Sequence, residues 1–286
     1  MTTMIPGILA ASRPISWVNT AFPFAAAYLL SGGKVDSILI LGTVFFLIPY
    51  NIALYGINDV FDYESDIRNP RKGGIEGAVL PKQMHAPLLW ASILTTVPFL
   101  AYLFWNGTAA SALWLALTIF SVIAYSAPRL RFKERPILDS VTSSAHFTGP
   151  ALVGSTITVG DTNSWFVLGL VAFFIWGVAS HAFGAVQDVK ADREAGLSSV
   201  ATVLGARWTT RASAALYLLT TILLFFLPFP SQIVALFSLG YVLITVRYWS
   251  ITDETCEQAN SSWRMFLLLN YLSGAAVTIS LAWVFL

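Results

Sequence analysis

Long apolar segments dominate this chain and restrict what it can fold into. Nine of them can be drawn at roughly membrane-spanning length, over about residues 15–31, 37–57, 85–104, 108–127, 137–158, 164–186, 209–227, 231–250 and 264–286. Charged residues make up only 11% of the 286 positions, whereas a soluble domain normally carries about 25%. The sequence therefore predicts an all-α, polytopic membrane protein with nine transmembrane helices in a single domain over residues 1–286.

The connections between the segments alternate in charge. Of the sixteen Lys and Arg residues, only Lys34 falls on the side with short, nearly uncharged loops, and the other fifteen fall on the opposite side. The protein is expected in the cell membrane. Because positive charge is retained in the cytoplasm, its N-terminus is expected in the cytoplasm and its C-terminus outside the cell. The N-terminal residues lack the basic stretch, short apolar core and cleavage site of a signal peptide, so no removable one is expected. The single cysteine, Cys256, excludes an intrachain disulfide framework.

Acidic residues follow two of the apolar segments at a regular spacing. After the second segment, residues 58–66 read Asn-Asp-Val-Phe-Asp-Tyr-Glu-Ser-Asp. Read as a continuation of that helix, Asn58, Asp62 and Asp66 share one face, with neighbours roughly 5–6 Å apart. Asp188 and Asp192 repeat the spacing at the end of the sixth segment. Solvation at a helix end would explain any single acid, but it does not require the repeated pattern.

Carboxylates clustered in this way repel one another unless a cation lies between them. No Cys or His cluster accompanies them, so a hard ion with oxygen ligands is expected, and Mg²⁺ is the obvious choice. Basic residues lie on the same side, among them Arg131 and Lys133 in the loop between the two motifs. Such residues can donate hydrogen bonds to the phosphate oxygens that the metal does not bind. The sequence predicts an Mg-diphosphate site at the cytoplasmic mouth of a helical bundle, beneath an apolar chamber.

Polar and aromatic groups continue from the motifs into the apolar helices. Tyr55 and Asn51 precede the first motif on its own face, and His181 precedes the second. A hydrogen bond between helices explains Asn51 and His181 equally well, and plain packing explains Tyr55 and Tyr125. The functional alternative is a cavity in which aromatic faces stabilise a carbocation. Both interpretations stay open from the sequence.

Taken together, the motifs resemble those of the UbiA superfamily of intramembrane prenyltransferases. The resemblance rests on residues 58–66 and 188–192, and on Tyr-Ser-Ala-Pro-Arg-Leu-Arg-Phe-Lys over 125–133. Arg13 with the proline after it, and Arg71 after the first motif, match as well. The resemblance implies a UbiA-like bundle around a central apolar cavity, which binds a prenyl diphosphate and two Mg²⁺ ions.

The resemblance also implies roles for individual residues. The metal ligands, which are also the catalytic residues, would be Asn58, Asp62, Asp66, Asp188 and Asp192. The diphosphate would contact Arg13, Arg71, Lys72, Arg131 and Lys133. The candidates for the cavity and for stabilising a cation are Asn51, Tyr55, Tyr125 and His181. Asp59 is left out because it points about 100° away from Asn58 on a helix.

One departure from the family pattern narrows the choice of acceptor. Members that act on aromatic acceptors commonly carry a second Arg-Pro shortly after the position of Arg71, where this chain reads Lys-Gly-Gly-Ile-Glu over 72–76. Together with residues 13–24 and 48–57, this version resembles the actinobacterial lycopene elongases. That resemblance implies dimethylallyl diphosphate as donor and lycopene, or a related lipophilic molecule, as acceptor. Membrane lipids are expected as further partners. A C40 carotenoid would then be extended through C45 to C50.

Three other functions stay open from the sequence. A UbiA-type enzyme could act on a quinone precursor or another polycyclic acceptor. A transporter would place its coupling carboxylates near the bilayer midplane, whereas these acids lie at helix ends beside basic loops. A CDP-alcohol phosphotransferase also uses membrane aspartates with Mg²⁺, but the sequence lacks its fixed array of Asp, Gly and Arg. No nucleic-acid partner is expected.

Overall fold

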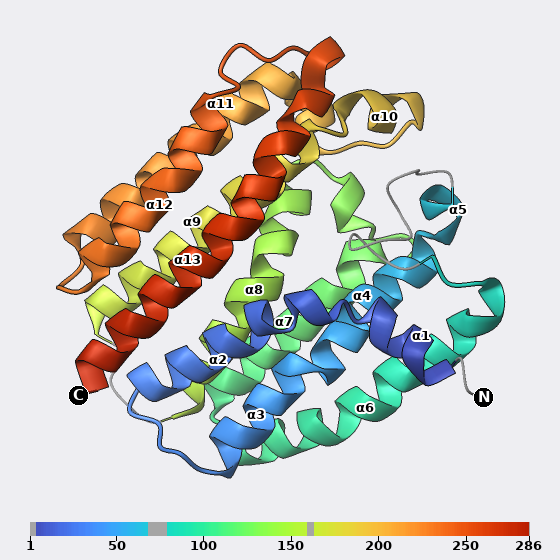
Figure 1. Cartoon of the computed structure of the whole chain (residues 1–286). Coiled ribbons are helices and arrows are strands. Elements are labelled where there is room, and N and C mark those ends of the chain that lie inside the picture. Colours follow the sequence, from blue (N-terminus) through green and yellow to red (C-terminus); the bar gives the residue numbers. More distant parts are fainter. Residues whose placement is uncertain (1–3, 68–78, 159–162, 286) are drawn as a thin grey trace. The chain divides into compact units, whose positions relative to one another are not determined.

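A computed structural model describes residues 4–67, 79–158 and 163–285, and every regular element in these ranges is a helix (Figure 1). The α-helices are α1 (Met4–Ala11), α2 (Val18–Leu30), α3 (Ser37–Leu47), α4 (Pro49–Phe61), α5 (Tyr63–Asp66), α6 (His85–Asn106), α7 (Ala109–Ser126), α8 (Leu138–Ile157), α9 (Ser164–Val186), α10 (Val189–Glu194), α11 (Val200–Phe226), α12 (Ser231–Val246) and α13 (Asn260–Phe285). Short 3-10 helices are η1 (Pro14–Ser16), η2 (Lys82–Met84), η3 (Phe132–Glu134) and η4 (Asp253–Ala259).

Each of the nine predicted segments overlaps at least one of these helices, so the all-α prediction is confirmed. Within the described residues, six helical stretches are long and apolar enough to cross a membrane: Ser37–Phe61, Lys82–Asn106, Ala109–Ser126, Ser164–Val186, Val200–Phe226 and Asp253–Val284. The apolar helix α12 is shorter. The number of nine crossings therefore stays a prediction.

The helices gather into two compact units. One comprises Met1–Arg131 with His146–Asp161, and the other comprises Phe132–Ala145 with Thr162–Leu286. Helix α8 contributes its first turns to the second unit and its remaining turns to the first. The prediction of one domain over residues 1–286 stays a prediction.

The first unit is built on aromatic packing between α2, α3 and α4. The ring of Phe46 lies 5.1 Å from that of Phe24, 4.7 Å from that of Phe45 and 5.2 Å from that of Tyr50. All four side chains are fully buried. Such ring pairs stabilise a core beyond the area that they bury. They fix α4, the helix that leads into the first acidic motif.

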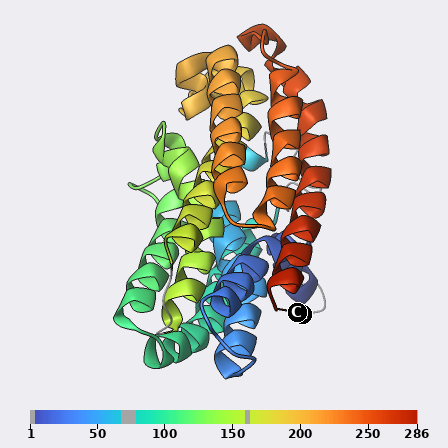
Figure 2. The ribbon, with the colours of Figure 1, turned by 90° about the vertical axis from the view of Figure 1, so that its left-hand side faces the viewer.

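In the second unit, α11 packs against α9 and α12, and α12 packs against α13 (Figures 1 and 2). Tyr217 and Tyr241 stack with ring centroids 5.4 Å apart, and Trp263 stacks on Phe266 at 4.5 Å. The buried Tyr217 hydroxyl donates to the Ser180 hydroxyl over 3.0 Å. This core fixes α9, the helix that leads into the second acidic motif.

The predicted segment over 37–57 is not one helix, because it breaks at Ile48. Pro49 has no N–H to donate and disfavours the helical conformation of the residue before it, and Ile48 accordingly lies at φ −118° and ψ −64°. The Asn51 side-chain amide donates to the carbonyls of Phe46 and Leu47 and to the Thr20 hydroxyl, over 2.7–3.0 Å. Asn51 therefore satisfies carbonyl groups at the break in an otherwise apolar core.

We expect Gly154→Ala to destabilise the first unit. A Cβ at Gly154 of α8 would overlap the backbone carbonyl of Phe24 in α2, and backbone cannot move aside as a flexible side chain can. Overpacking of this kind typically costs about 1–3 kcal/mol, which should lower the melting temperature of the detergent-purified protein.

The matched control is Gly274→Ala in α13, where an added Cβ would meet nothing within 4 Å. Because Ala favours a helix over Gly by about 1 kcal/mol, this variant should melt at or above the wild-type temperature. Equal melting of the two variants would contradict the close approach of α2 and α8.

Candidate active site

The first acidic motif begins on α4 and does not continue it as one helix. The Asp62 N–H donates to the Asn58 carbonyl over 2.9 Å, so Asn58 and Asp62 lie one helical turn apart, as predicted. Asp62, at φ −100° and ψ −1°, ends α4, and Asp66 belongs to the separate helix α5. The first motif is therefore not one continuous helix, because Asp is a poor helix former and Asp62 adopts a conformation typical of turns. The shared face of Asn58, Asp62 and Asp66 stays a prediction. The side chain of Asp66 lies outside the described part of the chain.

Asp59, which the sequence interpretation left out of the site, forms a buried ion pair. Its Oδ1 accepts a hydrogen bond from Nη2 of Arg13 over 3.0 Å, and its side chain is only 3% exposed. The Arg13 guanidinium also lies 4.3 Å from the ring centroid of Tyr55. A buried carboxylate needs such a partner, since an isolated charge in an apolar interior is costly. The feature of the sequence that could have indicated this pair was Arg13, the basic residue just before the first apolar segment.

A second arginine approaches the motif from the chain after α7. Nη2 of Arg131 lies 3.8 Å from Oδ1 of Asp62, which is 5% exposed. The Ser126 hydroxyl donates to Oδ1 of Asn58 over 2.7 Å. The last residue of α7 therefore contacts Asn58, and the segment after α7 contacts Asp62.

Both arginines have an unusual backbone conformation. Arg13 has φ 51° and Arg131 has φ 40°, and in the same stretch as Arg131 the φ of Arg129 is 73° and that of Ile137 is 74°. Left-handed φ values are uncommon for residues other than glycine and tend to cluster at functional sites. The backbone here is strained where it brings guanidinium groups to the acidic motif.

The second acidic motif forms its own short helix. Helix α9 ends at Val186, and Asp188 occupies the position just before α10. The Asp192 N–H donates to the Asp188 carbonyl over 2.8 Å, so the two acids share a turn as predicted. Both acids follow the apolar helix α9, and Asp192 lies in the separate short helix α10. Gly196, at φ 70°, ends the turn, and its N–H donates to the Arg193 carbonyl over 3.1 Å.

The cavity candidates all make contacts within their own units. Asn51 binds backbone carbonyls as described, and Nδ1 of His181 lies 3.1 Å from the Ser140 hydroxyl, which joins α9 to α8. The ring of Tyr125 meets that of His146 edge to face, with centroids 5.1 Å apart. His146 is buried and was not predicted; a histidine inside an apolar segment was the available signal. The role of these residues in a cavity stays a prediction.

The remaining basic candidates divide between the described and undescribed parts of the chain. Arg71 and Lys72 lie outside the described residues. Lys133 lies in η3 of the second unit and is partly buried. Of the five residues predicted to contact the diphosphate, Arg13 and Arg131 therefore lie beside the first motif in the described structure.

The metal-binding prediction can be tested against the donor atoms present. Among the described side chains, no group of three or more His, Cys, Asp or Glu residues could hold a metal ion. Asp66 is not among those described side chains. The donors that are described at Asn58, Asp62, Asp188 and Asp192 are amide and carboxylate oxygens, which are the ligand types that Mg²⁺ prefers. The donor chemistry fits Mg²⁺.

The sequence of the chain matches a known protein family. The model of the UbiA prenyltransferase family matches residues 20–270. The chain belongs to this family. As a UbiA family member it is a prenyltransferase, and its apolar helices are those of a multi-pass membrane protein.

Individual UbiA relatives cover almost the whole chain. A lycopene elongase/hydratase of Corynebacterium glutamicum is 61% identical over 274 residues, which are 96% of each protein. A C50 β-cyclic carotenoid biosynthesis protein of Dietzia sp. is 53% identical over 97% of this chain and 66% of its own length. The solved structure of a UbiA homolog from Archaeoglobus fulgidus bound to DMAPP and Mg²⁺ has a TM-score of 0.66, with 17% identity over 94% of this chain and 99% of that one. At that identity it shows that the fold is shared.

We expect Arg13 and Asp59 to be strongly coupled in a double-mutant cycle. Removing either partner leaves the other charge buried and compensated less well, so Arg13→Ala and Asp59→Ala together should destabilise the protein less than their sum. A coupling energy of about 1–3 kcal/mol is expected from unfolding of the purified protein.

The control cycle uses Lys82 and Glu64, whose 2.7 Å ion pair is exposed, with side chains 67% and 69% accessible. Its coupling energy should be well below that of Arg13 and Asp59, because solvent screens exposed charges. Additive effects at Arg13 and Asp59 would contradict a buried pair.

Proposed function

We propose that this prenyltransferase transfers a dimethylallyl group from dimethylallyl diphosphate to the ends of lycopene, giving C45 and C50 carotenoids. The observation that carries the proposal is the 61% identity, over 96% of both chains, to a lycopene elongase/hydratase. The similarity to a C50 carotenoid biosynthesis protein supports the same acceptor. A quinone precursor or another polycyclic acceptor is the competing substrate.

Breaking the C–O bond of an allylic diphosphate develops negative charge on the leaving group and positive charge on the allyl fragment. Bound Mg²⁺ supplies Lewis-acid stabilisation of the leaving group. In our proposal the metal is held by Asn58, Asp62, Asp66, Asp188 and Asp192, and the site opens toward the cytoplasm. The short turns that join Asn58 to Asp62 and Asp188 to Asp192 support this assignment.

Arginine side chains are proposed to bind the diphosphate oxygens. Nε of Arg13 is buried and makes no hydrogen bond to the described residues, while Nη2 of the same guanidinium is bonded to Asp59. A buried donor without a partner is costly unless an acceptor reaches it, and an anion would supply one. Arg131 beside Asp62 is proposed to act with it, together with Arg71, Lys72 and Lys133. Preorganised donors of this kind stabilise charge as it develops on the leaving group.

The acceptor can be tested in a lycopene-producing host that expresses this chain. We expect new pigments that are five and ten carbons larger than lycopene, resolved by liquid chromatography and mass spectrometry. An empty vector supplies the control. Transfer to an aromatic acceptor by the purified protein, with lycopene left unchanged, would favour the competing substrate.

The role of the first motif can be tested by Asp62→Asn. The substitution keeps the shape of the side chain and removes the charge proposed to bind metal, so turnover of the purified enzyme should fall at least about 100-fold.

The matched control is Asp36→Asn, which changes an acid that caps α3 by accepting the N–H groups of Ile38 and Leu39. The hydrogen bond from the Leu39 amide, against an opposing effect of burial, keeps the pKa of Asp36 below its ordinary value. Asn is an equally good cap, so this variant should keep its activity. Normal turnover and Mg²⁺ dependence in Asp62→Asn would contradict the metal role.

A further inference from the structure

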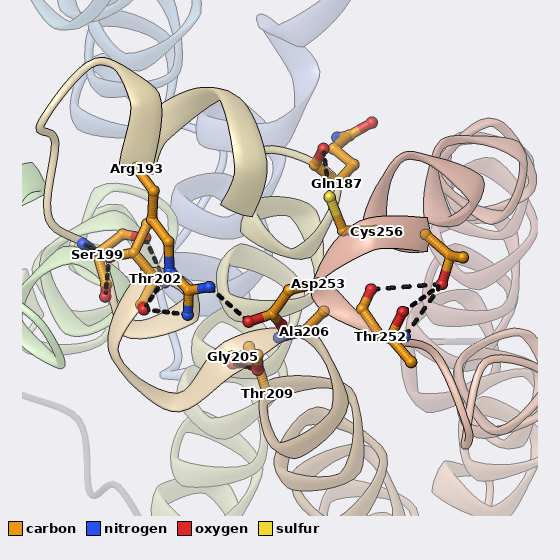
Figure 3. A network of polar contacts seen from close by, with 11 residues as sticks. Gln187, Arg193, Ser199, Thr202, Gly205, Ala206, Thr209, Thr252, Asp253 and Cys256 are labelled. Carbon is orange, nitrogen blue, oxygen red and sulfur yellow. Dashed lines mark hydrogen bonds and ion pairs between the residues drawn. The ribbon is translucent and has the colours of Figure 1, made fainter.

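The segment between α12 and α13 contacts the second acidic motif on both sides. Directly after Asp192, Arg193 donates from Nε and Nη2 to the Thr202 carbonyl over 3.0 and 2.7 Å, and from Nη1 to Oδ2 of Asp253 (Figure 3). Thr202 lies in the first turn of α11 and Asp253 in η4. Each of the three guanidinium nitrogens therefore donates to an acceptor within the second unit.

Asp253 also binds a backbone amide at a break in α11. Gly205 has φ 78° and ψ 160°, which no helix continues. Oδ1 of Asp253 accepts the N–H of Ala206, the next residue, over 2.7 Å. One carboxylate thus joins the kink in α11 to the arginine that follows the acidic motif.

A second contact lies on the other side of the motif. Gln187 precedes Asp188, and its Oε1 accepts a hydrogen bond from the Asn260 amide over 2.6 Å. The thiol of the buried Cys256 lies 3.7 Å from the Gln187 carbonyl. Residues 252–260 therefore hold both neighbours of the span that carries Asp188 and Asp192.

Tertiary contacts of this kind are needed because α10 has only six residues. A helix of that length is not stable by itself. The charge attraction between Arg193 and Asp253 would add little alone, since their side chains are 43% and 35% exposed. The fixed geometry comes from one guanidinium held on two acceptors, one of which is itself bonded to the α11 backbone.

We propose that Asp253 and Asn260 are positioning residues, which act through Arg193 and Gln187 to hold Asp188 and Asp192 in the orientation that binds the metal-diphosphate. This inference rests on the proposed function. It assigns Arg193 to positioning instead of to the diphosphate, because its guanidinium nitrogens all bind protein acceptors. The segment after α12 would thereby control a motif more than fifty residues earlier in the chain.

The first test uses hydrogen exchange of the metal-free protein, followed by mass spectrometry. In Asp253→Ala, the amides of residues 188–197 should exchange about tenfold faster, while those of α9 should be unchanged. Asp253→Asn keeps an oxygen for the Ala206 amide and should show a smaller increase with a nearly normal melting temperature. Glu257→Gln, at an exposed position of the same segment, is the matched control and should match the wild type.

The second test measures binding of Mg²⁺ and inorganic pyrophosphate by the thermal shift that they produce. Groups that orient metal ligands typically change metal affinity by about tenfold or more, so the Mg²⁺ concentration for half-maximal shift should rise about tenfold in Asp253→Asn. In a turnover assay the same variant should lose more in half-saturation by Mg²⁺ than in the maximal rate.

The outcomes separate this inference from the proposed function. Unchanged exchange of residues 188–197 in both Asp253 variants overturns the positioning role, whatever the acceptor proves to be. Faster exchange with an unaltered Mg²⁺ requirement overturns it too, since the contact would then be structural only. A wild type that binds Mg²⁺ and pyrophosphate but does not extend lycopene leaves the binding tests intact and removes only the acceptor assignment.

Discussion

Every interruption of a helix in an apolar environment leaves backbone N–H and C=O groups that must find another partner. This protein interrupts its helices repeatedly, and nearby polar side chains bind the groups that result. Asn51 binds the carbonyls at the Ile48 break, and Asp253 binds the amide beyond Gly205. Asn51 lies within the apolar helix α4, whereas Asp253 comes from η4, in the connection that follows α12.

The acidic motifs lie where these helices end or change direction. Asp62 ends α4, and Asp188 lies between α9 and α10. A carboxylate at such a place can be reached by groups from other segments, as Arg131 reaches Asp62. The same carboxylate in the middle of a continuous apolar helix would carry a larger cost of desolvation. Broken helices thus allow a prenyltransferase to keep several acids close to an apolar interior.

Much of the fold and part of the site could be predicted from the sequence. The apolar segments gave the helices, and the spacing of Asn58 to Asp62 and of Asp188 to Asp192 gave two genuine helical turns. The continuous helix through Asp66 was wrong because periodicity treats each residue as a further step of 100°, and carries no information on where a helix stops. Asp59 was left out because an argument from the angle between side chains on one helix ignores partners elsewhere in the chain. Its partner, Arg13, is 46 residues away.

The sequence by itself determined the class of protein and the residue types available for chemistry, because membrane-length apolar segments and oxygen-rich motifs are local properties of the chain. Tertiary structure alone decided which charges meet: Arg13 with Asp59, Arg131 with Asp62, and Arg193 with Asp253. The reason is physical. Burial makes an unpaired carboxylate costly at Asp59 and Asp62, and Asp253 also binds the Ala206 amide of α11. Each partner is selected by the packing of distant segments, and no spacing along the chain records that packing.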